Sequence, residues 1–508
     1  MLNSVLTLFE AVRLQSVFVF LFVFLLGLYW TRLPKNLPPG PTGWPVIGSA
    51  LALRRGLSHH VFTHWSKQYG EVFSVRLGGK LVVVLNDLRC IKDALHKQAD
   101  VFSDRHNSTV NKLNGIKGAF SEESGDIWKA RRRFGLGALR SFGMGKKSNE
   151  HSINEESRYL LDGFADEQGK PFNPTHQVEI TVSNVICKMC VGRRFNFSDP
   201  DIAEILQLIR QQLSYGTPTS LINYVPGVIH TPFYSHVKTI SRRLKEHFSC
   251  IVREHRDSYD KNDIRDIIDL QFAEVEKRET SGRVDDRFEK DSFDDVAMRG
   301  SVFDLFVGGT ETTSTTLLWL MMLMALHPNI QRKVQSEIDD VIGGSRQPSM
   351  ADSPNMPYTN AAILETLRIR PAVPLAVPHQ TKEETLLNGY TVPRNTCVLI
   401  NILAVHHDPA TWTEPEKYNP ARFLSADGKS VVQHESFIPF GTGRRRCMGE
   451  SLARTELFLI FVNLLQQFSL KFPAEKPLPS EEGLPGIILK PGPFEICVTR
   501  RTSKAHTN

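Results

Sequence analysis

The chain has 508 residues, of which 41% are hydrophobic and 23% charged, and its formal net charge is +6. This balance is that of a globular protein, and it excludes a disordered, collagen-like or multi-span membrane protein. The small basic excess forms no dense stripe, so the sequence does not predict nucleic-acid binding. The seven cysteines are sparse and unpatterned, which argues against a disulfide scaffold and favours a reducing compartment.

The N-terminal segment 14–31 contains no charged residue and is rich in Phe, Leu and Val. At about 18 residues it is close to the minimum length of a transmembrane helix. A cleaved signal peptide is the alternative, but no small-residue cleavage site follows. Basic residues come next, which favours a cytosolic location for the rest of the chain. We therefore expect a membrane anchor over 1–32, a stiff proline-rich hinge over 33–50 and a single large domain over 51–508.

The body is predicted to be mostly helical. Two β-branched runs, 71–75 and 81–85, are separated by two glycines and predict a hairpin. A short strand is predicted at 396–400, a helix from about 448 to 468, and a C-terminal hairpin that pairs 487–490 with 495–499. Apolar residues at helical spacing predict further helices near 125–145, 176–193, 201–215, 238–258 and 293–345. The expected fold class is therefore mostly α with small β-sheets (α+β).

The segment 437–449, Phe-Ile-Pro-Phe-Gly-Thr-Gly-Arg-Arg-Arg-Cys-Met-Gly, holds the cysteine with the most distinctive surroundings, Cys447. Its glycines permit a tight loop with inward-facing N–H groups, and its arginines favour a nearby negative charge. A helix predicted directly after Cys447 adds its positive N-terminal end. We expect these features to lower the pKa of the thiol, and a thiolate is a ligand suited to iron. A buried structural cysteine in a basic loop is the alternative.

The loop fits the pattern F-x-x-G-x-R-x-C-x-G and resembles the haem-binding signature of the cytochrome P450 family. The resemblance extends from the N-terminal segment to the C-terminus and is closest to the second microsomal family of animals. It implies the cytochrome P450 fold, haem b, monooxygenase activity, and Cys447 as the axial ligand of the haem iron. The other residues that it assigns to cofactor binding are Arg445, Trp128, Arg132, Arg105, His379, Phe440, Gly441, Gly449, Gly308 and Gly309.

Two further motifs agree with this resemblance. Trp128 and Arg132 fit W-x-x-x-R and lie four residues apart on one helix face, so both side chains can reach one haem propionate. Glu365 and Arg368 fit E-x-x-R on one helical turn. With Arg422 they match a triad that, in the family, holds the cysteine loop in place through a buried ion network.

A third motif, Gly-Gly-Thr-Glu-Thr-Thr at 308–313, is unusual inside a helix because glycine and threonine both weaken it. It resembles the family's oxygen-activating motif, in which Gly308 and Gly309 would open a groove for dioxygen and water. Glu311 and Thr312 match the catalytic acid–alcohol pair. There Thr312 would order water, and Glu311 would relay protons by rotating toward solvent. A polar stripe that faces solvent is the alternative.

The resemblance also implies partners. No G-x-G-x-x-G motif opens a helix after a strand, so we expect no intrinsic flavin or nicotinamide site. Electrons would come from NADPH–cytochrome P450 reductase, in some members with cytochrome b5, in the endoplasmic reticulum membrane with the catalytic domain in the cytosol. A basic docking face for such an acidic partner is predicted from Lys129, Arg131, Arg133, Arg140, Lys146, Lys147, Arg444 and Arg446.

The expected reaction inserts one atom of O2 into a lipophilic substrate, with fatty acids favoured slightly over steroids and xenobiotics. By resemblance, the pocket lining is expected to include the loop 107–120, Phe303, Val307, Val373, Leu375, Ala376, Val377 and the turn 486–488. Two alternatives stay open. One is a haem-dependent isomerase or dehydratase of lipid peroxides, which generally lacks the acid–alcohol pair, and the other is a non-enzymatic membrane haem protein.

Overall fold

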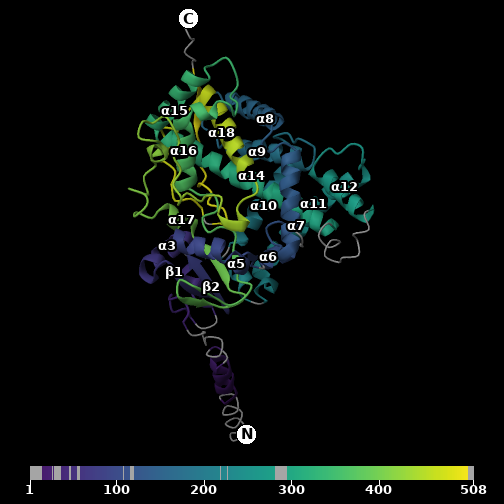
Figure 1. Cartoon of the computed structure of the whole chain (residues 1–508), viewed down its shortest axis with the longest axis vertical. Coiled ribbons are helices and arrows are strands. Elements are labelled where there is room, and N and C mark those ends of the chain that lie inside the picture. Colours follow the sequence, from purple (N-terminus) through teal and green to yellow (C-terminus); the bar gives the residue numbers. More distant parts are fainter. Residues whose placement is uncertain are drawn as a thin grey trace, which may run out of the picture.

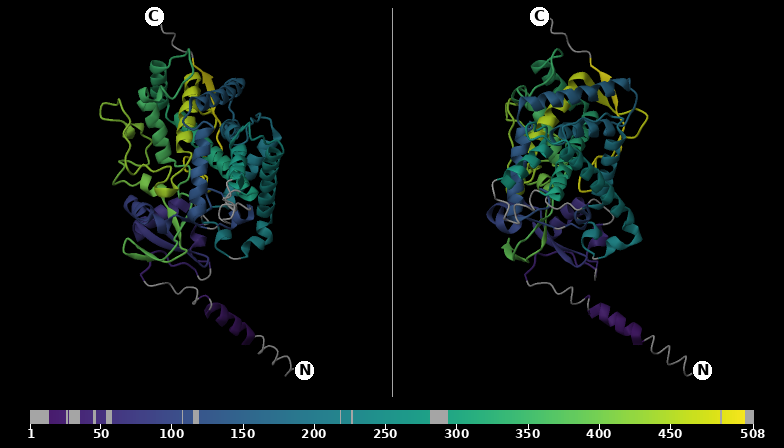
Figure 2. Two further views of the ribbon diagram at one scale, coloured as in Figure 1. Left: turned by 45° about the vertical axis from the view of Figure 1, so that its right-hand side comes forward. Right: turned by 90° about the vertical axis from the view of Figure 1, so that its right-hand side faces the viewer.

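The computed structural model describes residues 14–25, 27, 36–44, 47–53, 58–106, 108–114, 119–217, 219–225, 227–280, 294–484 and 486–501. Helices form most of the described body, and a small sheet lies at the end nearer the N-terminal helix (Figure 1). Figure 2 shows the same arrangement from two further directions. The predicted class, mostly α with small sheets, is confirmed.

The predicted helices are present, and most begin and end within a few residues of the expected positions. The α-helices of the described chain are α2 (Ala50–Leu53), α3 (Ser58–Tyr69), α4 (Leu88–Lys92), α5 (Ala99–Phe102), α6 (Thr109–Asn114), α7 (Gly125–Ser141), α8 (Lys147–Asp166), α9 (Thr175–Cys190), α10 (Pro200–Tyr215), α11 (Ser235–Asp257), α12 (Ile267–Thr280), α14 (Asp295–Leu326), α15 (Pro328–Val341), α16 (Pro357–Ile369), α17 (Ile402–His406) and α18 (Glu450–Gln467).

Short strands and single helical turns connect these helices. The strands are β1 (Val72–Leu77), β2 (Lys80–Leu85), β3 (Asp104–Arg105), β4 (His379–Gln380), β5 (Thr385–Leu387), β6 (Tyr390–Val392), β7 (Cys397–Ile400), β8 (Phe468–Lys471) and β9 (Cys497–Arg500). The turns are η1 (Asp93–Lys97), η2 (Leu221–Asn223), η3 (Val228–His230), η4 (Pro232–Tyr234), η6 (Ser353–Asn355), η7 (Pro420–Phe423) and η8 (Gly443–Arg445).

Helix α14 carries the Gly-Gly-Thr-Glu-Thr-Thr segment through the body. Its N-terminus is capped by Asp294, whose carboxylate accepts a hydrogen bond from the N–H of Ala297 at 2.7 Å. Its C-terminal half is buried on every side, as expected of a helix that is apolar all round. The helix ends at His327 because Pro328 starts α15, where proline suits the first helical position. The predicted helical segment 293–345 therefore contains two helices, which meet at His327 and Pro328.

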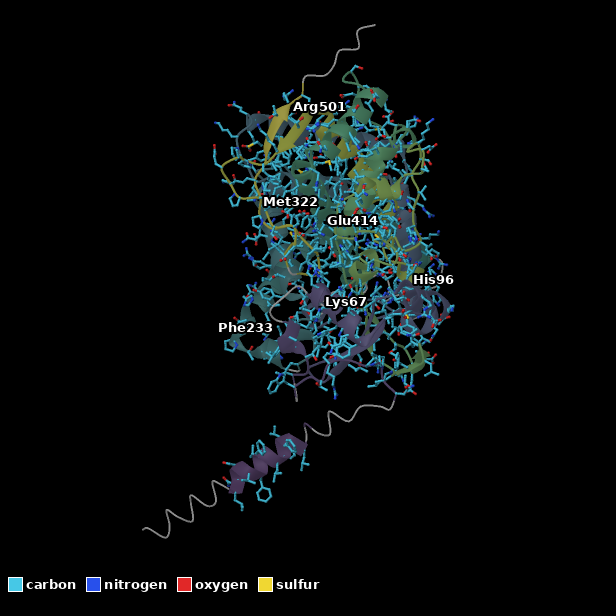
Figure 3. The ribbon with its side chains drawn as sticks, turned by 90° about the vertical axis from the view of Figure 1, so that its left-hand side faces the viewer. Lys67, His96, Phe233, Met322, Glu414 and Arg501 are labelled. Atoms are coloured by element: carbon cyan, nitrogen blue, oxygen red, sulfur yellow. The ribbon has the colours of Figure 1, made fainter. Side chains whose placement is uncertain are left out.

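The main apolar core lies where α14 meets α9, α16 and α18. Met322 of α14 is completely buried there and lies inside the body in Figure 3. By contrast, Phe233 is 73% exposed and lies at the edge of the same view. The core thus fixes α14, and with it the glycine–threonine segment, between neighbouring helices.

A five-stranded sheet, in the order β1-β2-β7-β4-β3, joins strands from residues 72–105 to strands from residues 379–400. Strands β1 and β2 form the predicted antiparallel hairpin. Its turn requires glycine at Gly78, which has a φ of +60°, because a Cβ there would lie 2.6 Å from the carbonyl oxygen of Tyr224. Strand β7 pairs with β2 in parallel, from Val82 opposite Cys397 to Leu85 opposite Ile400.

The predicted C-terminal hairpin is wrong. Strand β9 pairs with β8, from Phe468 opposite Arg500 to Lys471 opposite Cys497. The segment 487–490 takes part only in an isolated bridge between Leu484 and Lys490. Because β8 directly continues α18, β9 finds its partner at the end of that helix and not in the preceding loop.

The predicted membrane span lies only partly within the described residues. Residues 14–25 are helical, and their apolar side chains are exposed. Residues 1–13, 26 and 28–32 of the predicted anchor lie outside the described part, as do residues 33–35, 45 and 46 of the hinge. Within the residues that are described, none of the helices combines the length and the apolar character that a membrane span requires.

Candidate active site

The cysteine loop is a tight turn that leads into α18. The N–H of Cys447 donates a hydrogen bond to the carbonyl of Phe440 at 3.0 Å, which closes the loop. Gly443 has a φ of +72°, and a Cβ there would lie 2.5 Å from the carbonyl oxygen of Leu95, so only glycine fits. His96, at the edge of the body in Figure 3, hydrogen bonds with Thr442 at 2.6 Å and secures the loop on its outer side.

The Cys447 thiol differs from the sequence expectation in its pKa. Its side chain is accessible to solvent, yet the surrounding protein atoms desolvate the sulfur, and this raises the pKa of Cys447 above its usual value. The N–H of Gly449, together with Arg132 and Arg446, acts in the opposite direction, as predicted. The expectation of a lowered pKa is therefore wrong for the protein alone, because desolvation outweighs the neighbouring positive groups. A cation at the sulfur would reverse this balance.

Arg445, two residues before Cys447, places its guanidinium among backbone carbonyls. It donates to the carbonyl oxygens of Ser103 at 2.8 Å, Phe120 at 3.3 Å and Glu123 at 2.5 Å. Its guanidinium lies 3.9 Å from the ring centroid of Trp128, which is buried in α7.

Arg105 and Arg132 lie close enough to Arg445 to raise its electrostatic energy. Arg105 donates to the carbonyl of Val377 at 2.7 Å, and Arg132 donates to the carbonyl of Arg446 at 2.6 Å. Burial and mutual repulsion lower the pKa of Arg445 to about 8 and that of Arg105 to about 10. Within the described chain, none of the three guanidinium groups forms an ion pair, and the buried Nε of Arg105 has no hydrogen-bond partner.

His379 completes this group on strand β4. Its Nδ1 lies 2.7 Å from the carbonyl of Phe102, so it donates a hydrogen bond there. Burial and the neighbouring Arg105 and Arg445 lower its pKa well below the usual value. The structure therefore brings together four of the predicted propionate contacts as a positively charged group without a described counter-ion, a donor set that fits the carboxylates of a haem.

The glycine–threonine segment presents two kinds of surface. The hydroxyl of Thr312 is partly exposed and donates to the carbonyl of Gly308 at 2.7 Å. A Cβ on Gly308 would meet open space, whereas one on Gly309 would lie 3.0 Å from Ile186 of α9. Gly308 thus leaves room beside α14, and Gly309 allows α9 to pack closely against it.

Glu311 does not face solvent. It is completely buried, and its Oε2 lies 2.5 Å from the Nζ of Lys490. Burial raises the pKa of Glu311, and Lys490 opposes this effect. The alternative of a solvent-facing polar stripe is therefore wrong for this acid. Lys490 carries no sequence signal of its own, and no motif could have identified it.

Asp304 is a further buried carboxylate of α14, and, like Lys490, it is not among the predicted site residues. Its oxygens accept hydrogen bonds from the N–H of Ser121 at 2.7 Å and from its hydroxyl at 2.9 Å. Desolvation raises the pKa of Asp304 to about 6 despite these bonds. Asp304 thereby ties α14 to the segment that precedes α7.

The predicted triad is a buried ion network. Arg368 forms two hydrogen bonds with Glu365, at 2.7 and 2.8 Å, and neither side chain is exposed. Arg422 adds a third contact, 3.2 Å from Glu365. Arg368 also donates to the carbonyls of His406 and Pro415, so the network fixes the irregular chain that precedes the cysteine loop.

The predicted basic docking face needs a correction. Arg131 is buried, and it donates to the carbonyl of Ala297 at 2.7 Å and to Ser301, so it holds α7 against α14. Arg444 is exposed but pairs with Asp100. Lys129 and Arg446 are also exposed but pair with Asp126 and Glu450. The remaining members of the predicted face are exposed: Arg133, Arg140, Lys146 and Lys147.

Comparison with known proteins identifies the family to which the chain is similar. A family model described as "Cytochrome P450" matches residues 38–498. Human "Cytochrome P450 2U1" is 36% identical and covers 94% of this chain and 92% of its own length. Mouse "Cytochrome P450 2J5" is 37% identical, with 98% and 99% covered, and human "Cytochrome P450 2D6" is 37% identical, with 97% and 99% covered.

Proposed function

The chain belongs to the cytochrome P450 family and is a haem-dependent monooxygenase, and on this premise we propose that Cys447 is the cysteine that ligates the haem iron. Bound haem supplies an iron centre that activates dioxygen. Cys447 is accessible and lies beside Arg132 and Arg446, which favour its thiolate. By contrast, Cys187 and Cys397 are buried, and burial raises the pKa of each to about 12.

The arginine group supports a second assignment. Arg445, Arg105 and Arg132, with Trp128 and His379, would hold the haem propionates. Their guanidinium groups already satisfy several donors on backbone carbonyls, so they are positioned before any carboxylate arrives. Two carboxylates would relieve the repulsion that lowers the pKa of Arg445.

The acid–alcohol pair would supply protons during oxygen activation. The hydroxyl of Thr312 donates to the carbonyl of Gly308, so its oxygen can accept a hydrogen bond from water on the accessible side. Burial raises the pKa of Glu311, so this acid takes up a proton more readily than an ordinary carboxylate does, as suits a proton donor. This pair supports a monooxygenase over an isomerase that needs no protons from solvent.

The substrate class, the electron donor and the cellular location are also proposals. Phe303 and Val307 of α14 are partly buried apolar side chains near Gly308, which supports a lipophilic substrate, with fatty acids first and steroids or xenobiotics next. Electrons would come from NADPH–cytochrome P450 reductase, with cytochrome b5 as a second donor. The helical residues 14–25, exposed and apolar, support an anchor over 1–32 in the endoplasmic reticulum, followed by a hinge over 33–50 and a catalytic domain over 51–508.

The assignment of Cys447 is tested by the spectrum of the reduced protein with carbon monoxide. We expect a strongly red-shifted Soret band from thiolate ligation, and we expect Cys447→Ala to lose it. Cys250→Ala is the matched control, because Cys250 is also accessible but donates its S–H to Glu254. If Cys447→Ala keeps the band, or if Cys250→Ala loses it, the assignment is wrong.

Turnover with purified reductase tests the rest of the proposal. NADPH and O2 should be consumed together with a fatty acid, and product should contain one oxygen atom from O2. Conversion of a lipid peroxide without NADPH would favour the isomerase. Haem binding with no turnover of fatty acids, steroids or xenobiotics would favour a non-enzymatic haem protein.

A further inference from the structure

Two buried carboxylates and two partly exposed cations form a group of charges at α14. We call it the Lys490 cluster, and its members are Lys490, Glu311, Glu179 of α9 and Arg210 of α10. The Nζ of Lys490 lies 2.5 Å from Glu311 and 3.6 Å from Glu179. Arg210 pairs with the other oxygen of Glu179. The two carboxylates are almost completely buried, whereas the side chains of Lys490 and Arg210 are 23% and 38% exposed. The cluster therefore connects the buried acid of α14 to solvent through two cations.

The ionisation of Glu311 depends on its neighbours in this cluster. A buried carboxylate is costly unless a cation accompanies it. Burial raises the pKa of Glu311, Lys490 lowers it, Glu179 raises it again, and the more distant Arg210 lowers it. The buried Glu456 of α18 accepts a hydrogen bond from Thr313, the residue that follows Thr312. Lys490 stands between two carboxylates and is the nearest cation to Glu311.

The orientation of Glu311 separates it from its catalytic neighbour. Consecutive side chains leave an α-helix about 100° apart, and Glu311 points toward Lys490 and α9, whereas Thr312 bonds back to Gly308. Within the described chain, neither carboxylate oxygen of Glu311 has a hydrogen bond of regular geometry, and of the two only Oε2 has an ion-pair contact, with Lys490. Lys490 thus holds one oxygen of the carboxylate and leaves the other able to take a proton.

The segment that carries Lys490 is tied to the same helix. The indole N–H of Trp319, on α14, donates to the carbonyl of Leu489 at 2.8 Å, and the N–H of Leu489 donates to Ala372 at 2.9 Å. The N–H of Leu484 donates to the carbonyl of Lys490 at 2.7 Å. These bonds fix the backbone at Lys490, so the ammonium can reach either carboxylate only by moving its own side chain.

We propose that Lys490 is a positioning residue for proton delivery, which holds Glu311 as a carboxylate turned toward α9 between proton transfers. The inference rests on the proposed role of Glu311 as the acid that serves Thr312. Because Oε1 is buried, a proton from solvent reaches it through water beside the partly exposed ammonium of Lys490. Lys490 then pairs with Glu179 alone, and neutral Glu311 turns and passes the proton to water at Thr312. The carboxylate returns to Lys490, so one proton enters and one leaves, and only O–H bonds form and break.

The first test uses the resting haem-loaded protein and needs no turnover. Infrared difference spectra between H2O and D2O detect a protonated carboxylic acid. We expect Lys490→Met to show one such band more at neutral pH than wild type and Lys490→Arg do. The buried Glu456, whose pKa is also raised by burial, contributes equally to all three spectra. The additional band should disappear in the double variant Lys490→Met/Glu311→Gln. No new band in Lys490→Met, or an additional band that survives in the double variant, would overturn the inference.

The second test measures product formed per NADPH as a function of pH. In Lys490→Met, the part of this pH profile that reflects the titration of Glu311 should move to higher pH by roughly 1–3 units. This is the size of pKa shift expected when an opposite charge is lost. Glu179→Gln should move it to lower pH, because a like charge is removed. The KM for substrate should stay unchanged in both. Coincident profiles for wild type and both variants would overturn the inference.

A matched control separates these effects from a general change of charge. Lys476 lies in the same C-terminal region and pairs with Glu495 at 2.7 Å on the surface. Lys476→Met should leave both the infrared spectrum and the pH profile as in wild type. If Glu311→Gln itself leaves the product ratio unchanged, the proposed role of Glu311 fails. The infrared result for Lys490→Met still decides, independently, whether Lys490 holds the carboxylate.

Discussion

At the scale of single residues, the site contains buried charges that are paired with an opposite charge and others that are not. Glu365 and Arg368 are fully buried and satisfy each other through two hydrogen bonds. In the described chain, the guanidinium groups of Arg105 and Arg445 donate only to backbone carbonyls, and burial, together with repulsion from neighbouring arginines, lowers the pKa of both. The first pair therefore stabilises the apoprotein, whereas the second gains stability only when an anion binds.

This difference gives a prediction for Arg368→Leu. Its loss leaves the buried carboxylate of Glu365 without its main partner, and we expect a destabilisation of roughly 3–5 kcal/mol, measured by thermal or denaturant unfolding of the haem-loaded protein. Arg242→Leu is the control, because Arg242 forms an exposed pair with Glu246 one turn away and should change stability by about 0.5 kcal/mol or less. Equal losses in the two variants would show that the triad does not stabilise the fold.

At the scale of elements, the cysteine loop depends on where its glycines lie. Gly441 and Gly443 both have a positive φ, but a Cβ on Gly441 would meet no atom within 4 Å. A Cβ on Gly443 would collide with the backbone of Leu95. The same backbone conformation therefore tolerates a side chain at one position and excludes it at the other.

We accordingly predict different results for two alanine substitutions. Gly441→Ala should cost about 1–2 kcal/mol, the cost of a left-handed conformation for alanine. Gly443→Ala should cost more and should lower haem content, because η8 must move away from Leu95. The comparison uses haem content per protein and the thermal midpoint of each variant. Equal losses in the two variants would indicate that backbone strain, and not the collision with Leu95, determines the cost of each substitution.

The sequence predicts elements well where the signal is local. Helices α7, α9, α10, α11 and α18 follow from apolar spacing, and the β1–β2 hairpin follows from two adjacent glycines. The C-terminal hairpin fails because the true partner of β9 is β8, which lies before the loop. Pairing between distant strands depends on packing of the whole body, and no local pattern records it.

The site divides in the same way. The cysteine loop, the triad and the acid–alcohol pair lie in compact motifs, so the sequence locates them. Lys490 contacts Glu311 and Glu179, and Asp304 binds Ser121, all of them far away in the sequence. A lone lysine near the C-terminus carries no signal until the fold brings it to α14. The pKa of Cys447 also required the structure, because desolvation depends on every neighbouring atom.

At the scale of the whole molecule, buried histidines make stability depend on pH. Burial lowers the pKa of His59, His406 and His407 to about 3 and that of His106 to about 4. In the unfolded chain each titrates near 6.5. Between these values the unfolded state binds more protons than the folded state, so the free energy of unfolding falls as pH falls.

We predict a loss of stability from pH 6.5 downward, with each such histidine contributing up to about 1.4 kcal/mol per pH unit. His59→Leu should make the pH dependence shallower, because the unfolded chain then has one such proton-binding group fewer. The substitution breaks no described hydrogen bond of the buried Nε2. His151→Leu, a surface substitution on α8, is the control. Denaturant unfolding at a series of pH values measures both slopes, and identical slopes for the two variants would contradict the prediction.

The parallel pairing of β2 with β7 also constrains how the protein is made. Strand β2 leaves the ribosome about 300 residues before its neighbour in the sheet. At about 5–20 residues per second, the hairpin must wait on the order of 15–60 seconds with an unpaired apolar edge. Such an edge is a template for unwanted strand pairing. The nascent chain therefore passes through a period in which the finished core does not yet protect the first strands of the protein.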